Sequence, residues 1–493
     1  MSLAARRGRG GRRRRRLTVG ATALFVVLLL PAPAPAAQPL QTAIVDGGPA
    51  FYGPEAPLGF TRVRQAGASA VRLYLGWSET APQGAVKPAG FDAANPDDPG
   101  YRWSTIDQQV KLATARGLKP IISVSSAPEW AETGSRGGFT AGTVRPDPVE
   151  FGLFAQALAK RYSGQTPGLP RVRDYQAWNE PNVVVHLSPQ IEGGRVVSPG
   201  HYRLMVEQFA AAVHAVHPDN VVIAGGLSAF ENANSVGPLP FMRQLLCMSA
   251  ANRPLAGCRP LSFDVWSHHP YTSGGPTHHA LSPNSVSLPD LPRMRRLLLA
   301  AVRAGHVKPN GAIRFWVTEF SWDTTPPDPR AVPVLLQARW VSESLYRMWT
   351  NGISLVTWFQ LRDEALKPAG HQATYESGLY FRCARGLTCD RPKPALTAFR
   401  FPFVAFRTGG RVLVWGRTPG GARGSVVVEQ RSGGRWRRLA SLRSDRYGIF
   451  QRKLRPRGSG DMRARLSRGG AKALPFSLRR PADLPVCPFG APC

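Results

Sequence analysis

Two glutamates each follow a short apolar run and end it. Glu180 lies in YQAWNEPN (residues 175–182) and directly precedes Pro181. Glu319 lies in WVTEFSW (residues 316–322), after a second apolar run. An acid at the exposed end of a buried strand is well placed for chemistry. Two such acids facing each other could divide the work of a general acid and a nucleophile.

Other polar and aromatic side chains occur at comparable places. Arg72 lies in AVRLYLGW, Asn179 precedes Glu180, and SHHPY contributes His269 and Tyr271. An arginine and a tyrosine near Glu319 would keep that carboxylate ionised, and the Asn179 amide could bind a sugar hydroxyl. Aromatic rings could also stack on sugar faces, and the candidates are Trp77, Trp130, Trp322 and Trp358.

Each of these residues also has a simpler interpretation. Asn-Glu-Pro is a common turn signal, Glu319 could belong to a structural ion pair, and the histidines and tryptophans could pack in the core. The sequence indicates neither a metal ion nor an organic cofactor. The prediction of a site depends on all these residues falling at strand ends of one architecture.

Between residues 42 and 400, short runs rich in Val, Ile, Trp and Tyr alternate with helical segments. Such alternation predicts a parallel sheet, and eight strands predict a (β/α)8 barrel whose chemistry lies at the carboxyl ends of the strands. We expect strands at TAIVDGG, AVRLYLGW, KPIISVSS, DYQAWNE, NVVIAGG, FDVWSHH, IRFWVTEF and ISLVTWFQ. We expect helices at residues 104–118, 148–162, 200–217, 291–305 and 331–352.

The pattern changes after residue 403. Short strands with Gly-rich turns, including GRVLVWGRT, GSVVVEQRSGGRWRRLASL, RYGIFQRKLR, DMRARLS and LPFSL, predict a small antiparallel β-sandwich. We therefore divide the chain into residues 1–37, a catalytic barrel at 38–403 and a basic C-terminal domain at 404–493. The sequence therefore predicts an α/β protein in which a (β/α)8 barrel is followed by a small all-β domain.

Residues 1–37 have the pattern of a signal peptide. A run of arginines precedes about 14 apolar residues and the small-residue segment PAPAPAA. The apolar run is shorter than the roughly 20 residues of a membrane span, although an uncleaved signal anchor is an alternative. The paired arginines permit either Tat or Sec export. We expect a secreted or cell-surface protein.

The net charge of +32 is concentrated near the C-terminus, because residues 404–493 hold 20 Lys and Arg against 4 Asp and Glu. Attraction to an anionic cell envelope or acidic glycan would use this charge. Nucleic-acid binding does not suit an exported protein, and a general arginine bias of the composition is the simpler alternative. We expect no nucleic-acid partner and a monomer.

The six cysteines form three close pairs in the sequence. Each pair brackets a loop-like stretch, which predicts the disulfides Cys247–Cys258, Cys383–Cys389 and Cys487–Cys493. Metal ligation is the alternative, but the sequence has no Cys-x-x-Cys spacing.

The segment AWNEPN followed by WVTEFSW resembles the clan A retaining glycoside hydrolases. The resemblance, which covers about residues 42–400, implies that Glu180 is the acid/base, Asn179 the partner of the sugar 2-hydroxyl and Glu319 the nucleophile. Arg72, the His269–Tyr271 pair and Trp358 resemble the cellulase-like family 5. That family usually has a histidine near the end of strand 3, where this sequence has SVSSAPEWA; the APEW segment resembles family 39 and its neighbours.

The sequence therefore predicts a secreted retaining glycosidase that acts on a β-linked oligo- or polysaccharide by double displacement, with Glu180 kept protonated by a partly desolvated pocket. Two alternatives use the same barrel. One is a carbohydrate- or envelope-binding protein without catalysis, and the other is a transglycosylase that uses both glutamates.

Overall fold

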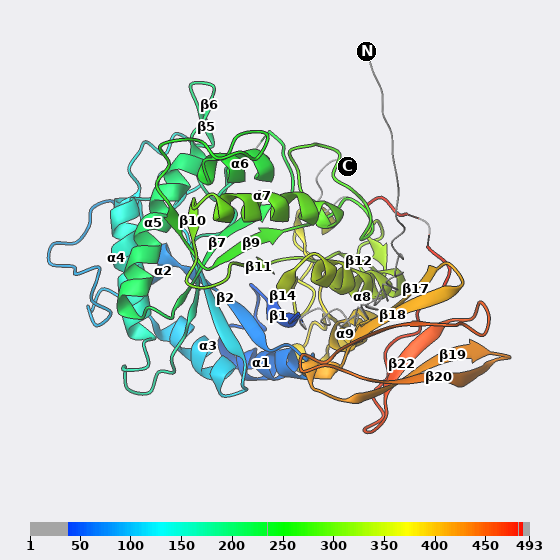
Figure 1. Cartoon of the computed structure of the whole chain (residues 1–493). Coiled ribbons are helices and arrows are strands. Elements are labelled where there is room, and N and C mark those ends of the chain that lie inside the picture. Colours follow the sequence, from blue (N-terminus) through cyan, green and yellow to red (C-terminus); the bar gives the residue numbers. More distant parts are fainter. Residues whose placement is uncertain (1–37, 234, 482, 487–493) are drawn as a thin grey trace, which may run out of the picture. The chain divides into compact units, whose positions relative to one another are not determined.

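The computed structural model describes residues 38–233, 235–481 and 483–486. Eight parallel strands form a closed barrel in which β14 pairs with β1 (Figure 1), as the sequence predicts. The strands are β1 (Gln41–Val45), β2 (Ala70–Gly76), β3 (Lys119–Ser125), β4 (Asp174–Gln176), β7 (Val221–Ser228), β9 (Val265–His269), β11 (Arg314–Val317) and β14 (Ile353–Phe359). All eight strands lie within the predicted runs or within two residues of them.

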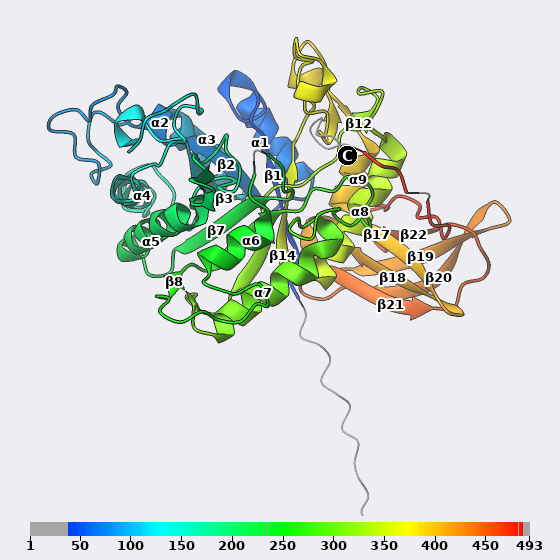
Figure 2. The same ribbon diagram turned by 90° about the horizontal axis from the view of Figure 1, so that it is seen from above.

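Helices connect the strands and cover the outside of the barrel (Figures 1 and 2). They are α1 (Ala56–Gln65), α2 (Trp77–Thr80), α3 (Ser104–Thr114), α4 (Pro148–Arg161), α5 (Ser198–Val216), α6 (Pro238–Leu245), α7 (Leu291–Arg303), α8 (Val334–Thr350) and α9 (Pro394–Arg400). Helix α4 shows how the sequence fixes a helix start: Asp147 accepts hydrogen bonds from the backbone N–H groups of Val149 and Glu150, and Pro148 occupies the first turn. None of the described helices is both long and apolar enough to cross a membrane.

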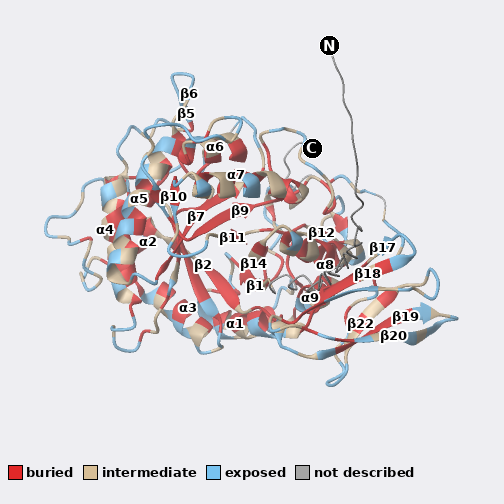
Figure 3. Cartoon of the chain, in the orientation of Figure 1, coloured by how far each residue is buried: buried red, intermediate tan, exposed pale blue. Residues whose placement is uncertain are grey.

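The interior of the barrel has its own apolar cluster. It consists of Ala43, Ala70, Ile121, Val221, Ile223, Val265, Trp316 and Leu355, which come from seven of the eight strands. These side chains are buried and fill the barrel as a packed core, and Figure 3 shows the barrel strands coloured mostly as buried. The polar side chains of the strand ends therefore sit above a packed interior.

Two antiparallel three-stranded sheets follow the barrel and form the predicted sandwich. One has the order β17 (Phe403–Thr408), β18 (Arg411–Arg417), β21 (Ile449–Leu454); the other has the order β20 (Arg435–Arg443), β19 (Ser425–Ser432), β22 (Met462–Leu466). The strand predicted at residues 474–478 is wrong: Phe476 makes only an isolated bridge with Met462. Pro475 cannot donate to a ladder, which explains the missing strand.

The first sheet packs on the barrel through aromatic rings. Trp415 of β18 is buried between Tyr346 and Trp349 of α8, with ring centroids 5.5 and 5.7 Å apart. Phe406 of β17 lies 5.5 Å from Tyr346. Helix α8, the sheet β17–β18–β21 and the sheet β20–β19–β22 thus form successive layers. The exact domain boundary at residues 403/404 stays a prediction.

Two of the predicted disulfides, Cys247–Cys258 and Cys383–Cys389, are confirmed. The third, Cys487–Cys493, and the predicted signal peptide lie outside the described residues.

Candidate active site

A cavity of about 390 Å³ opens at the carboxyl ends of the barrel strands. Several of its lining residues end a strand or directly follow one, as a site in this fold requires. The lining consists of Gly47, Tyr74, Ser125, Asn179, Glu180, His186, Ser228, Glu319, Phe359, Gln360, Glu364 and Tyr375. Both predicted glutamates therefore face one cavity.

The backbone near Glu180 is not a continued strand. The chain was expected to stay extended to residue 180, but β4 ends at Gln176, and Trp178 and Glu180 adopt φ values of 71° and 42°. Left-handed backbone at residues other than glycine is strained and must be held by its surroundings. The N–H of Glu180 donates to the carbonyl of Gly226 at the end of β7 (3.1 Å). The Gln176 side chain donates to the carbonyl of Trp178 (3.0 Å).

A close approach of β7 to β9 helps to shape this turn. Gly225 has φ 91°, and a Cβ placed on it would lie 2.4 Å from the carbonyl oxygen of Ser267. Only glycine fits there without a shift of the backbone. The register of β7 against β9 shifts at the same place. Strand β7 is therefore locally bent where the carbonyl of Gly226 accepts the hydrogen bond from the N–H of Glu180.

The carboxylate of Glu180 lies between two histidines. Its Oε1 is 2.8 Å from Nδ1 of His269, and its Oε2 is 3.5 Å from Nε2 of His186. Nε2 of His269 is 3.1 Å from the hydroxyl of Thr318. In this ring orientation Nδ1 and Oε1 can share one proton, and the Thr318 hydroxyl can donate to Nε2 or accept from it. His269 is fully buried, so this orientation is fixed by packing.

Glu319 has a different environment, with three donors around it. Its Oε2 accepts from Nη1 of Arg72 (3.1 Å) and from the hydroxyl of Tyr74 (2.9 Å), and its Oε1 accepts from the hydroxyl of Tyr271 (2.8 Å). Burial by itself raises the pKa of Glu319, but the charges of His269 and Arg72 and the two hydroxyl donors lower the pKa below its ordinary value. The group is therefore held ionised at neutral pH.

Arg72 connects the surroundings of the two acids. Its side chain is fully buried, and its Nη2 donates to Oδ1 of Asn179 (2.6 Å) and to Oγ of Ser123 (3.0 Å). The same guanidinium therefore orients the amide beside Glu180 and the carboxylate of Glu319. The predicted residues Arg72, Asn179, His269 and Tyr271 are all brought together at this site.

An oxygen of Glu180, a nitrogen of His269 and an oxygen of Glu319 lie within 4.8 Å of one another. Such a group has the ligand types of a metal site. However, Glu319 already accepts from Arg72 and two tyrosines, and a cationic guanidinium 3.1 Å from one ligand oxygen repels a metal ion. The arrangement suits two carboxylates that act directly on a bound molecule.

The prediction of stacking tryptophans is corrected by the structure. Trp77 packs against Phe151 and Phe154 of α4, and Trp322 packs against Trp340 of α8. Trp358 is buried and donates its indole N–H to the carbonyl of Ser377. Trp130 is half-buried and donates to the carbonyl of Pro82. None of the four lines the cavity.

The alternation of a barrel strand explains the error at Trp358. Successive side chains of a strand point to opposite faces, so one of Trp358 and Phe359 points inward and the other outward. Phe359 lines the cavity. Trp358 contacts Phe320 and also contacts Phe399, which lies on α9. An aromatic residue does lie at the end of β14, one position further along.

Sequence reasoning missed other lining residues. Tyr74 could have been found, because it lies two positions after Arg72 on the same strand and therefore on the same face. His186, Glu364 and Tyr375 lie on loops, and no periodic signal marks them. Oε2 of Glu364 accepts from the N–H of Tyr375 (3.0 Å) and pairs with Nζ of Lys367 (2.7 Å).

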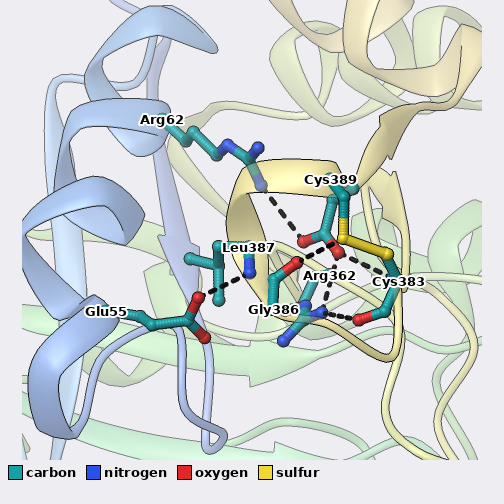
Figure 4. The surroundings of a disulfide bond; sticks show 8 residues. Glu55, Arg62, Arg362, Cys383, Gly386, Leu387 and Cys389 are labelled. Carbon is teal, nitrogen blue, oxygen red and sulfur yellow. Dashed lines mark hydrogen bonds and ion pairs between the residues drawn. A yellow bond between two sulfur atoms is a disulfide. The ribbon is translucent and has the colours of Figure 1, made fainter.

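The loop after β14 carries Gln360 and Glu364, and a buried ion-pair network supports it. Asp390 is buried and accepts from Arg62 of α1 (3.1 Å) and from Arg362 (2.7 Å). The Cys383–Cys389 disulfide closes the turn that directly precedes Asp390, and Figure 4 shows this disulfide close to Arg362. Arg362 also donates to the carbonyl of Cys383 (3.0 Å). The disulfide thus supports the wall of the cavity through two contacts of Arg362.

No protein-family model and no curated protein sequence matches this chain. Solved structures do resemble it. A monomeric β-xylosidase from Caulobacter crescentus CB15 is 16% identical, with 85% of this chain and 95% of that chain covered and a TM-score of 0.49. The GH39 enzyme from Xanthomonas axonopodis pv. citri is 15% identical (85% and 91% covered, TM-score 0.47). A GH30 endoxylanase from Clostridium papyrosolvens C71 is 13% identical (85% and 94% covered, TM-score 0.43).

Proposed function

We propose that this chain is a retaining glycoside hydrolase that cleaves a β-linked glycan. The observation that carries the proposal is the pair Glu180 and Glu319, which face one cavity with oxygens within 4.8 Å of each other. A short separation of the carboxyl groups favours retention, because inversion needs space for a water molecule between the acid and the sugar.

The contacts of the two acids support different roles. Glu319, with three donors and a lowered pKa, is the nucleophile: its carboxylate forms a bond to the anomeric carbon as the glycosidic C–O bond breaks. Glu180 gives its proton to the departing oxygen. In the second step Glu180 takes a proton from water, the water oxygen bonds to the anomeric carbon, and the bond to Glu319 breaks.

Arg72 and the two tyrosines have a role in both steps. They compensate the charge of Glu319 before attack and stabilise it again when it departs as a carboxylate. Asn179, held by Arg72 and exposed to the cavity, is the proposed partner of the sugar 2-hydroxyl. Transfer to another sugar in place of water would use the same intermediate, and no contact of the site favours such an acceptor.

Hydrolysis of aryl β-glycosides (glucoside, xyloside, mannoside and galactoside) by wild type, Glu180→Gln and Glu319→Gln tests the proposal. We expect one glycoside to be hydrolysed with net retention at the anomeric carbon. Loss of the acid/base should lower kcat roughly 10²- to 10⁴-fold, and loss of the nucleophile should lower it further. Glu129→Gln, an exposed glutamate outside the cavity, is the control.

A 2-deoxy-2-fluoro glycoside of the same sugar should label Glu319, as mass spectrometry of a digest would reveal. Inverted product, or full activity of both variants, would sink the mechanism. Binding of the glycan without turnover by wild type would instead favour the carbohydrate-binding alternative.

We also propose that the chain is exported through its N-terminal segment, that it is a monomer, and that an anionic envelope polymer attracts it. The two disulfides support an oxidising compartment. Cell fractionation of the native host would test export: protein found only in the cytoplasm would contradict it.

A further inference from the structure

The outermost face of the sandwich carries a group of arginines. In the sheet β20–β19–β22, Glu429 pairs with Arg438 and Arg463, and Arg431 pairs with Trp436. Residues paired across an antiparallel sheet lie on the same face. The face opposite Val426, Val428 and Ala464, which are buried in the sandwich, therefore carries a set that we call the arginine face: Arg431, Trp436, Arg438, Arg443, Arg463 and Arg465.

Two of these arginines are held in place. Glu429 is 7% exposed. Its Oε2 accepts a hydrogen bond from Nε of Arg463 (2.8 Å), and its Oε1 accepts one from Nε of Arg465 (2.8 Å). The guanidinium of Arg463 also lies 4.1 Å from the ring centroid of Trp436. Because both arginines bind Glu429 through Nε, their terminal nitrogens remain available, and these make no hydrogen bond within the described chain.

The other three arginines add charge around this pair. Arg431, Arg438 and Arg443 are exposed, and none forms an ion pair with an acid among the described residues. One glutamate thus faces five arginines. If these arginines served only to keep the surface soluble, no buried carboxylate would be needed to fix the orientation of Arg463 and Arg465. A fixed guanidinium loses less freedom on binding and can meet a carboxylate through two parallel hydrogen bonds.

We propose that the arginine face binds a polysaccharide that bears carboxylates, such as a polyuronate. The choice of a glycan rests on the proposed function of the barrel. It is supported by Trp436, whose half-buried ring lies among the arginines, since sugar rings stack on aromatic faces while their carboxylates pair with guanidinium groups. The surface would hold the enzyme on a polymer while the barrel acts elsewhere along it.

The test measures binding of polygalacturonate oligomers to the full chain carrying Glu319→Gln, so that turnover plays no part. Methyl-esterified oligomers of the same length provide an uncharged ligand. We expect the free acid to bind with an affinity that falls as NaCl rises, and the ester to bind much more weakly. This result does not depend on catalysis, so failure of the proposed function would be seen separately in the aryl glycoside assay.

Three variants locate the surface. Arg431→Gln/Arg438→Gln/Arg443→Gln should weaken binding roughly tenfold, as expected for three exposed ion pairs. Lys111→Gln/Arg296→Gln/Arg303→Gln removes the same charge from exposed positions on α3 and α7 and should change affinity by less than about twofold. Arg463→Lys/Arg465→Lys keeps the charge but removes the planar guanidinium groups that can donate two parallel hydrogen bonds to a carboxylate. This variant should weaken binding several-fold while leaving the sheet intact.

Equal losses in the two triple variants would mean that net charge alone attracts the polymer, and would overturn the proposal. So would equal binding of the ester, or the absence of binding by the parent chain. A duplex DNA that binds more tightly than polygalacturonate and loses affinity in the same variants would assign the face to nucleic acid instead.

Discussion

At the scale of residues, the two glutamates differ in what surrounds them. Glu319 accepts three hydrogen bonds, one of them from a buried guanidinium, whereas Glu180 contacts two imidazoles. Enzymes assign an acid and a nucleophile to two carboxyl groups through such differences of environment. Arg72 contacts Glu319 and the amide next to Glu180, so a change at this residue would disturb both.

The tyrosines that contact Glu319 provide the first prediction. Burial raises the pKa of Glu319, and the nearby charges and hydroxyls lower it by more. Tyr271→Phe or Tyr74→Phe removes one donor, so the pKa should rise and the acidic limb of kcat/KM should move to higher pH. Loss of a hydrogen bond to a charged group should also lower kcat/KM roughly 10- to 100-fold.

The pH dependence of kcat/KM for wild type and both variants checks this prediction. Below its pKa Glu319 is protonated and could not act as the proposed nucleophile, so the variants should lose activity at a higher pH than wild type. Tyr447→Phe, in the turn between β20 and β21 of the C-terminal domain, is the control and should leave the profile unchanged. An acidic limb that does not move would contradict the role of these hydroxyls.

At the scale of elements, the loop after β14 depends on a buried ion pair. Nζ of Lys393 donates to Asp363 (2.6 Å), to the hydroxyl of Thr324 (2.8 Å) and to the carbonyl of Glu376 (2.8 Å). Both charged side chains are 1% exposed or less. The pair joins the segments before and after Glu364 and Tyr375, which line the cavity.

Lys393→Met should destabilise the protein by about 3–5 kcal/mol, because it leaves Asp363 buried without its partner. Asp363→Asn in the same chain should recover part of this loss, since a neutral amide needs no counter-ion and can still accept from Gly378. Urea unfolding of the wild type and of the single and double variants gives the comparison. A double variant that is no more stable than Lys393→Met would contradict this account.

At the scale of the whole molecule, the sandwich is a packed layer of the structure. Trp415 is fully buried against α8, whereas Trp436 lies on the opposite, outer sheet. Trp415→Ala should therefore lower the free energy of unfolding by about 3–5 kcal/mol. Trp436→Ala, the matched control, should change it by less than about 1 kcal/mol.

Thermal and urea unfolding of these two variants measure the coupling between the sheets and the barrel. Equal stability of Trp415→Ala and wild type would mean that the sandwich contributes little to the barrel. A large loss only for Trp415→Ala would show that the aromatic contact with α8 is required.

Local sequence patterns predict the architecture and place both glutamates near the ends of strands. Strand–helix alternation is a local property, because each strand or helix has its own apolar period. Once eight strands are counted, residues that follow the strand ends, such as Glu180 and Glu319, must gather at one face of the barrel. The cysteine pairs at 247–258 and 383–389 could also be predicted, since their partners are close in the chain.

Contacts between distant segments of the chain set which side chains line the cavity and what those side chains touch. Arg72 and Glu319 are 247 positions apart, and no local pattern links them. Tryptophans of this kind could stack on sugar rings, but three of the four are buried in the core against α4, α8 and α9. Side-chain direction in a barrel depends on register and closure, which are set by contacts among all eight strands.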